Sequence, residues 1–174
     1  MFDRVIYWFE KSVLGLNLCP FAAKPYREGG IRFVSSSAQT DVDCLTDLFD
    51  CLNQLDQQPD IETMVLICPH HLQDFSDYNQ FLDYCDALLE QQGWSGIYQI
   101  ASFHPDYQFA ENLPDDRANW TNRSPSPLLH LIREASISRA VAVANSAAIP
   151  ARNIQTIEAL SEAQMIEIFG AHLR

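Results

Sequence analysis

Residues 63–71 read Thr-Met-Val-Leu-Ile-Cys-Pro-His-His, and this stretch decides the predicted fold. Its first six residues form a nearly continuous apolar run. A run of this length is typical of a strand that is buried on both faces of a sheet. Pro69 has no amide proton to donate, so it ends the strand and leaves His70 and His71 at the carboxyl end. The stretch therefore predicts a central strand with helices on either side of it.

Strand and helix patterns alternate around this run. We predict strands at residues 31–35 and 96–102, and amphipathic helices at residues 40–55 and 74–92. The order strand, helix, strand, helix, strand favours right-handed crossovers between parallel strands. We expect a single α/β domain with a small, mainly parallel sheet of three or four strands flanked by helices. A ferredoxin-like α+β arrangement is the alternative.

The ends of the expected elements carry further signals. Thr40 with Asp43, and Ser161 with Gln164, have the spacing of capping boxes at helix starts. Residues 2–16 carry apolar side chains at the spacing of one helix face.

Four segments are predicted to lie outside these regular elements. Residues 17–30 form a turn followed by a basic irregular loop, and residues 110–122 form a polar loop that has the character of a lid. Residues 149–153 are predicted as a turn. Residues 140–144 fit either a helix or a fourth strand, and both alternatives stay open.

Length and charge limit the classes of function. A chain of 174 residues suffices for one hydrophobic core, so we expect a single domain over residues 1–174. The net charge of −12 disfavours binding to nucleic acid or to anionic membranes. No apolar run reaches the roughly 18 residues that span a bilayer, and charged residues interrupt the first segment where a signal peptide is apolar. We expect a cytoplasmic protein, and no sequence motif indicates a cofactor.

Cys19 stands apart among the five cysteines. The other four lie on predicted apolar stripes or at a strand end, and an odd number without a Cys-x-x-Cys pair argues against a disulfide framework or a zinc ribbon. Cys19 precedes Pro20 in a turn, near the positive charges of Lys24 and Arg27, which favour a reactive thiolate. It is a candidate nucleophile, redox thiol or thiolate ligand, and the alternative is an inert cysteine buried in a turn.

A second candidate is His104, in the segment Ala-Ser-Phe-His-Pro-Asp-Tyr-Gln-Phe at residues 101–109. It follows a predicted strand, and the carboxyl ends of parallel strands are where such sheets bind ligands. An imidazole titrates near neutrality and suits acid, base or metal chemistry. The alternative is a structural histidine that is hydrogen-bonded to the backbone.

The segment after residue 122 is expected to contribute an anion site. Ser124 and Pro125 read as the N-cap and first residue of a helix over residues 125–138. Arg123 would join the free amides of that helix end to hold a carboxylate or phosphate.

The same predicted helix carries three polar side chains on one face, namely His130, Arg133 and Glu134. We expect His130 to act as an acid or base, and Arg133 to assist in anion binding. A solvated polar face with a surface ion pair is the alternative.

Several of these segments resemble a bacterial family catalogued as domain of unknown function 1415. The resemblance rests on Gly-Leu-Asn-Leu-Cys-Pro-Phe-Ala at residues 15–22, on residues 101–109, on Asn-Arg-Ser-Pro at residues 122–125, on residues 128–134 and on Ile-Pro-Ala-Arg-Asn at residues 149–153. It spans nearly the whole chain. Ser126 departs from the aromatic residue that the family pattern has between the two prolines. The resemblance implies that these polar residues form one set, and it implies no activity.

Three functional hypotheses follow from the sequence. The first is an enzyme that holds an anionic small molecule with Arg123, Ser124 and Arg133, and that uses His104, His130 and Cys19 as catalytic residues. The second is a non-catalytic module in which the same pocket binds a metabolite or an acidic peptide. The third is a metal site built from Cys19, His104 and His130.

Overall fold

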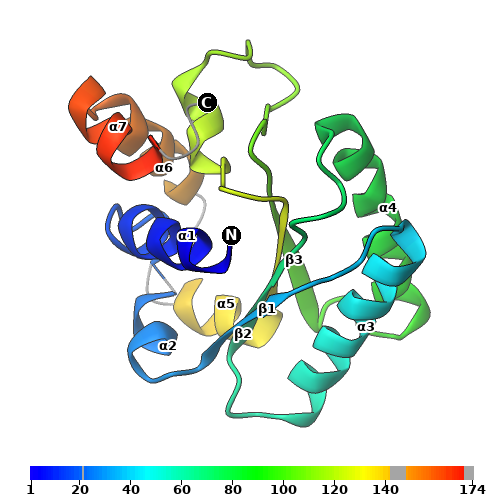
Figure 1. Ribbon diagram of the computed structural model, residues 1–174. Coiled ribbons are helices and arrows are strands. Elements are labelled where there is room, and N and C mark those ends of the chain that lie inside the picture. Colours follow the sequence, from blue (N-terminus) through cyan, green and yellow to red (C-terminus); the bar gives the residue numbers. More distant parts are fainter. Residues whose placement is uncertain (21, 142–147, 171–174) are drawn as a thin grey trace.

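The computed structural model describes residues 1–20, 22–141 and 148–170, and it has a four-stranded sheet between two layers of helices (Figure 1). The strands follow the order β1-β2-β4-β3. Their bounds are β1 Ile31–Ser35, β2 Thr63–Ile67, β3 Tyr98–Phe103 and β4 Leu128–Arg133. The predicted strand at residues 63–68 is therefore confirmed, and β2 is buried along its whole length.

The sheet is mixed. β1 pairs with β2 in parallel, whereas β4 runs antiparallel to both β2 and β3. The α/β class is confirmed, but a mainly parallel sheet is not accurate. β1, β2 and β3 still run in one direction, so their carboxyl ends lie at the same edge, as expected.

The predicted helix over residues 125–138 is wrong, because residues 128–133 form β4. Leu128, Leu129, His130 and Leu131 are all buried in this strand. A strand between two partners buries both of its faces, whereas a helix on the surface of a domain buries only one stripe. The following segment is helical as α5 Glu134–Val141.

One face of the sheet is covered by α3 Asp41–Gln57 and α4 Phe75–Gln91 (Figure 1). The side chains of Thr40 and Asp74 accept amide hydrogen bonds at the two helix starts. Met64, Leu66 and Leu129 from the sheet join the apolar stripes of these helices in one core. The two helices predicted between the strands are thus confirmed.

The other face packs against the helices at both ends of the chain. Figure 1 shows α1, α6 and α7 on this side. The elements have the bounds α1 Phe2–Trp8, η1 Phe9–Leu14, α2 Ala23–Arg27, α6 Ile149–Glu158 and α7 Glu162–Phe169. Val65, Ile67 and Leu128 lie in a second core with residues of these helices.

The terminal segments refine the sequence predictions. The helix predicted over residues 2–16 is α-helical only in α1 and continues as the π-helix η1. The expected turn at residues 149–153 begins α6, and the basic loop contains α2. The capping box of Ser161 and Gln164 is confirmed. Most of the ambiguous segment 140–144 lies outside the described residues.

Among the residues that the structure describes, no helix has both the length and the apolar composition needed to cross a membrane. The polar loop before β4 contains a short 3-10 helix, η2 Arg117–Thr121. This loop is fixed from inside by Asn119, which is fully buried. Its amide donates to the carbonyl of Leu113 at 2.8 Å, and its oxygen accepts the Phe109 amide at 3.1 Å. These hydrogen bonds make the loop a fixed part of the fold and give no support to the predicted lid.

Candidate functional site

His104 is a completely buried residue whose two ring nitrogens are both used. Nδ1 accepts the Asp106 amide at 3.0 Å, and Nε2 donates to the Leu72 carbonyl at 3.1 Å. The ring packs against Phe75 and Tyr78 at centroid distances of 5.2 and 5.1 Å. Burial lowers the pKa of His104, which favours the neutral ring. The geometry therefore matches the structural alternative, in which His104 fastens the end of β3 to the loop before α4.

Arg123 also serves the fold rather than an anion site. No helix follows it, so the expected cluster of free amides is absent from this part of the described chain. The guanidinium donates to the carbonyls of Tyr107 at 3.2 Å and Pro114 at 2.6 Å, and it stacks over Trp120. Ser124 is buried, and its hydroxyl donates to a backbone carbonyl two residues on.

Arg133 lies at the other end of the sheet from Arg123. Its guanidinium donates to the carbonyl oxygens of Leu55, Gln58 and Ile61. The distance from the guanidinium nitrogen to the oxygens of Gln58 and Ile61 is 3.1 Å in each case. These carbonyls belong to the end of α3 and the turn after it, where a cation offsets the negative end of the helix dipole. Arg133 therefore joins β4 to α3, and its other terminal nitrogen lies 3.4 Å from the Tyr98 hydroxyl.

His130 occupies the opposite face of the sheet from His104. Its ring contacts Phe9 and Phe103, which lie on the side of α1, and it is only 5% exposed. The metal site of Cys19, His104 and His130 is therefore not formed, because the two histidines are separated by the sheet. Within the described residues, no group of three potential ligands is placed to hold a metal ion.

The hydrogen bonds of His130 fix its tautomer. The Thr63 hydroxyl donates its only proton to the Leu131 carbonyl at 2.5 Å. Its oxygen, 2.7 Å from Nε2 of His130, must then accept from that nitrogen, which leaves a lone pair on Nδ1. Burial lowers the pKa of His130 to about 4. His130 is thus a neutral hydrogen-bond acceptor at neutral pH.

Cys19 lies in a turn that is held by the first residues of α6. The Asn153 amide donates to the Leu18 carbonyl at 2.7 Å, and Arg152 donates to the Asn17 carbonyl at 2.9 Å. Asn17 has a left-handed backbone with φ of 53°, which asparagine tolerates better than most residues. Two of the segments that carry the family resemblance therefore act together to place Cys19, which is half-buried and not in a disulfide.

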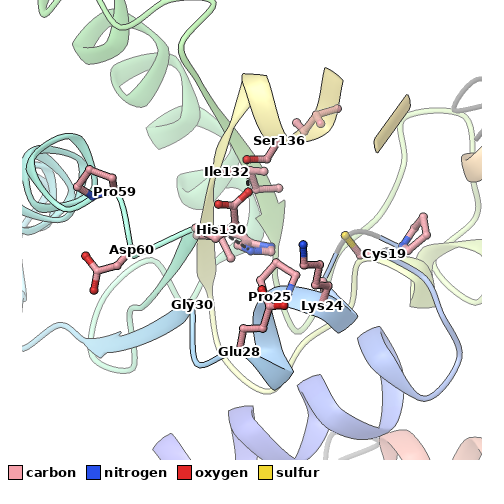
Figure 2. A pocket seen from close by; sticks show the side chains of 15 residues that line it. Cys19, Lys24, Pro25, Glu28, Gly30, Pro59, Asp60, His130, Ile132 and Ser136 are labelled. Carbon is pink, nitrogen blue, oxygen red and sulfur yellow. Dashed lines mark hydrogen bonds between the residues drawn. The ribbon is translucent and has the colours of Figure 1, made fainter. Parts of the chain in front are cut away.

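Cys19 and His130 line one pocket with a volume of about 770 Å³. This volume is in the range of small-molecule sites. Figure 2 shows the imidazole of His130 pointing into the pocket, with the sulfur of Cys19 and the amino group of Lys24 on one side of it. Glu28 lies below His130 at the end of the helix that carries Lys24, and Asp60 lines the pocket on the side away from Cys19 (Figure 2).

The pocket is not at the sheet edge that the sequence indicated. It is lined by Thr63 at the start of β2 and by Ile132 near the end of β4, so it lies near the amino ends of the parallel strands. A second pocket, of about 530 Å³, lies at the carboxyl edge. It contains the pair of His71 and Asp41, with 2.7 Å between Nε2 and a carboxylate oxygen.

Several pocket residues were not candidates from the sequence. Thr63 sits in the apolar run, and Glu28, Asp60 and Glu62 sit in polar segments that resemble ordinary surface loops. Glu62 accepts a hydrogen bond from Ser136. Only Lys24 had a local signal, because the sequence placed it in a basic loop beside Cys19.

These observations define a class of protein: a small α/β protein with a pocket that contains a thiol and a neutral imidazole. A family model described as a protein of unknown function, DUF1415, matches residues 1–167. The chain belongs to this family. No curated protein and no solved structure matches the chain.

Proposed function

We propose that this protein is an enzyme that binds a small polar molecule in the pocket of about 770 Å³ and uses Cys19 as its nucleophile. The observation that carries the proposal is the meeting of Cys19 and His130 in one pocket, although they lie far apart in the sequence. Thiols are the most nucleophilic side chains near neutral pH, and a reactive thiol needs a partly exposed position and a nearby positive charge.

The neighbouring residues have distinct parts in this proposal. Lys24 supplies a positive charge on the side of Cys19, where it stabilises a thiolate. His130 is too weak a base to hold a proton at neutral pH, so it accepts a hydrogen bond from the ligand and orients it. Thr63 keeps the ring of His130 in the required tautomer.

The ligand charge and the surroundings of the protein belong to the same proposal. Arg123 and Arg133 lend no support to an anionic ligand, because their guanidinium groups bind backbone carbonyls. The net charge of −12 supports a protein that does not bind nucleic acid. The sequence features given above support a cytoplasmic location, where thiols stay reduced.

We expect iodoacetamide to alkylate Cys19 at least about tenfold faster than any other cysteine of the folded protein. The other four are buried, and burial raises the pKa of Cys51 to about 12 and also raises the pKa of Cys85. The hydrogen bond with Cys44, together with burial, raises the pKa of Cys68. Mass spectrometry of the intact protein and of its peptides measures the rates. A Lys24→Met variant is expected to slow the alkylation about threefold, consistent with the modest effect of an exposed charge.

The exposed Lys11, which does not line the pocket, provides a matched control as Lys11→Met. Cys19 reacting no faster than the buried cysteines would contradict the proposal. Turnover is sought with a panel of esters, thioesters and amidines, whose central carbon a thiolate can attack. Conversion by the wild type that survives in Cys19→Ala would also rule out Cys19 as the nucleophile.

A second prediction concerns the turn that holds Cys19. Replacing Asn153 with alanine removes the hydrogen bond to the Leu18 carbonyl and is expected to change the alkylation rate of Cys19 about threefold or more. The global stability should fall by only about 1 kcal/mol, as for one hydrogen bond. The control is Thr156→Ala, which removes a hydrogen bond within α6 only. Equal alkylation rates in wild type and both variants would show that Asn153 does not position Cys19.

A further inference from the structure

The imidazole of His130 is a buried polar group of the pocket, and the described residues provide no donor for one of its two nitrogens. Nε2 of His130 is bound to Thr63, and among the described residues nothing donates to Nδ1. His130 is only 5% exposed, and it lines the pocket, so this nitrogen is approached from the pocket. A ligand with an N–H or O–H group that enters the pocket provides a donor for this nitrogen.

The described residues around the pocket have an excess of negative charge. Glu28, Asp60 and Glu62 contribute carboxylates, and Lys24 contributes one ammonium. Glu62 is also bonded to Ser136, so the exposed Glu28 and Asp60 are the carboxylates that a ligand can reach most readily. Together with the net charge of −12, they attract cations and repel anions.

The geometry points to a ligand that carries a protonated nitrogen, such as an amine or an amidine. We infer that this group donates to Nδ1 of His130 and faces Glu28 and Asp60. A protonated nitrogen has hydrogen-bond donors and no acceptor, so it matches both the unprotonated Nδ1 of His130 and the carboxylates. An anion such as a carboxylate or phosphate matches neither.

The inference rests on the proposed function in one respect: the end of the ligand that does not carry the cation is the end that reacts with Cys19. Figure 2 places Lys24 near Cys19, Glu28 below His130 at the end of the helix that carries Lys24, and Asp60 on the side of His130 away from Cys19. The two ends of the pocket therefore differ in charge. A ligand whose cationic group faces the carboxylates directs the rest of the molecule toward Cys19. Cationic recognition then sets the orientation of the substrate before the thiol reacts.

The test uses four probes of similar size: propylammonium, propylguanidinium, propionate and propyl phosphate. Each is added at constant ionic strength while iodoacetamide, which is uncharged, alkylates Cys19. We expect the two cations to slow the reaction about tenfold at about ten times their Kd, by simple occupancy of the pocket. We expect little protection by the two anions. The shift of the unfolding temperature with each probe gives a second readout that does not depend on Cys19.

The double variant Glu28→Gln/Asp60→Asn is expected to weaken protection by the cations about threefold to tenfold. The matched control is Asp86→Asn/Glu90→Gln, which removes the same charge from exposed positions of α4 on the far side of the sheet. Stronger protection by the anions, or equal protection in the wild type and both double variants, would overturn the inference while leaving Cys19 as the proposed nucleophile. Absence of selective alkylation at Cys19 contradicts the proposed function instead, and the thermal shifts then decide the ligand class alone.

Discussion

Replacing His104 with alanine is expected to lower the free energy of unfolding by about 4 kcal/mol. The ring is fully buried between Phe75 and Tyr78, so its loss leaves a cavity of aromatic size. The substitution also leaves the buried carbonyl of Leu72 unpaired, which costs about 1–3 kcal/mol, and removes the acceptor of the partly buried Asp106 amide. Urea unfolding at neutral pH measures the change.

Two further variants separate packing from hydrogen bonding at this position. His104→Phe keeps an aromatic ring but provides neither hydrogen bond, so we expect a loss of about 2 kcal/mol. His70→Ala changes an exposed histidine of the same region and is expected to stay within about 0.5 kcal/mol of wild type. A loss below about 1 kcal/mol in His104→Ala would refute the structural role of this residue.

His104 also shows where sequence reasoning stops. The sequence correctly places it just after a strand, but it does not tell which face of the sheet the ring occupies. Successive side chains of a strand point to opposite faces. Phe103 accordingly contacts His130 on the side of α1, while His104 contacts Tyr78 of α4. A difference of one position at the end of β3 therefore decides whether a side chain faces His130 and the helices at the chain ends, or α4.

The elements that were predicted correctly have strong local signals. β2 is a continuous apolar run, and α3 and α4 have amphipathic stripes with capping residues. Residues 128–133 have no such signal, because Leu-Leu-His-Leu-Ile-Arg fits either a buried strand or a helix. Pairing with β2 on one side and β3 on the other decides between them. That pairing depends on contacts between distant parts of the chain, so no local pattern reveals it.

In the candidate site, too, some features have a local sequence signal, and others depend on contacts between distant parts of the chain. Cys19 was singled out because it lies outside every predicted apolar stripe, and the structure places it at a pocket. Arg123 and Arg133 have the chemistry of anion binding, yet both bind backbone carbonyls. The number of unpaired carbonyls near an arginine is a property of the folded chain and has no counterpart in the sequence.

Lowering the pH from about 7 to about 4 is expected to reduce the free energy of unfolding of the wild type by about 3 kcal/mol more than that of a His130→Gln variant. The pKa of His130 is about 4 in the folded protein, against about 6.5 in an unfolded chain. As the pH falls below about 6.5, the unfolded chain takes up a proton that the folded protein excludes, so stability is lost. The stability of the folded protein with neutral His130 is fully present above about pH 6.5 and is lost progressively as the pH falls toward about 4. Glutamine cannot be protonated, and its amide can still donate to Thr63.

Urea unfolding of both proteins across this pH range measures the effect, and the quantity to follow is the difference in stability between them. This difference cancels the other titrating groups, including His104, whose lowered pKa acts in the same direction. The exposed His70 supplies the control as His70→Gln.

A difference that stays constant with pH would mean that His130 is protonated equally in the folded and unfolded states. A difference that grows in favour of the wild type on acidification would mean that the folded pocket stabilises the imidazolium, which is the behaviour expected if a carboxylate such as Glu62 outweighs burial. The pH dependence therefore reports directly whether His130 is the neutral acceptor on which the ligand inference depends.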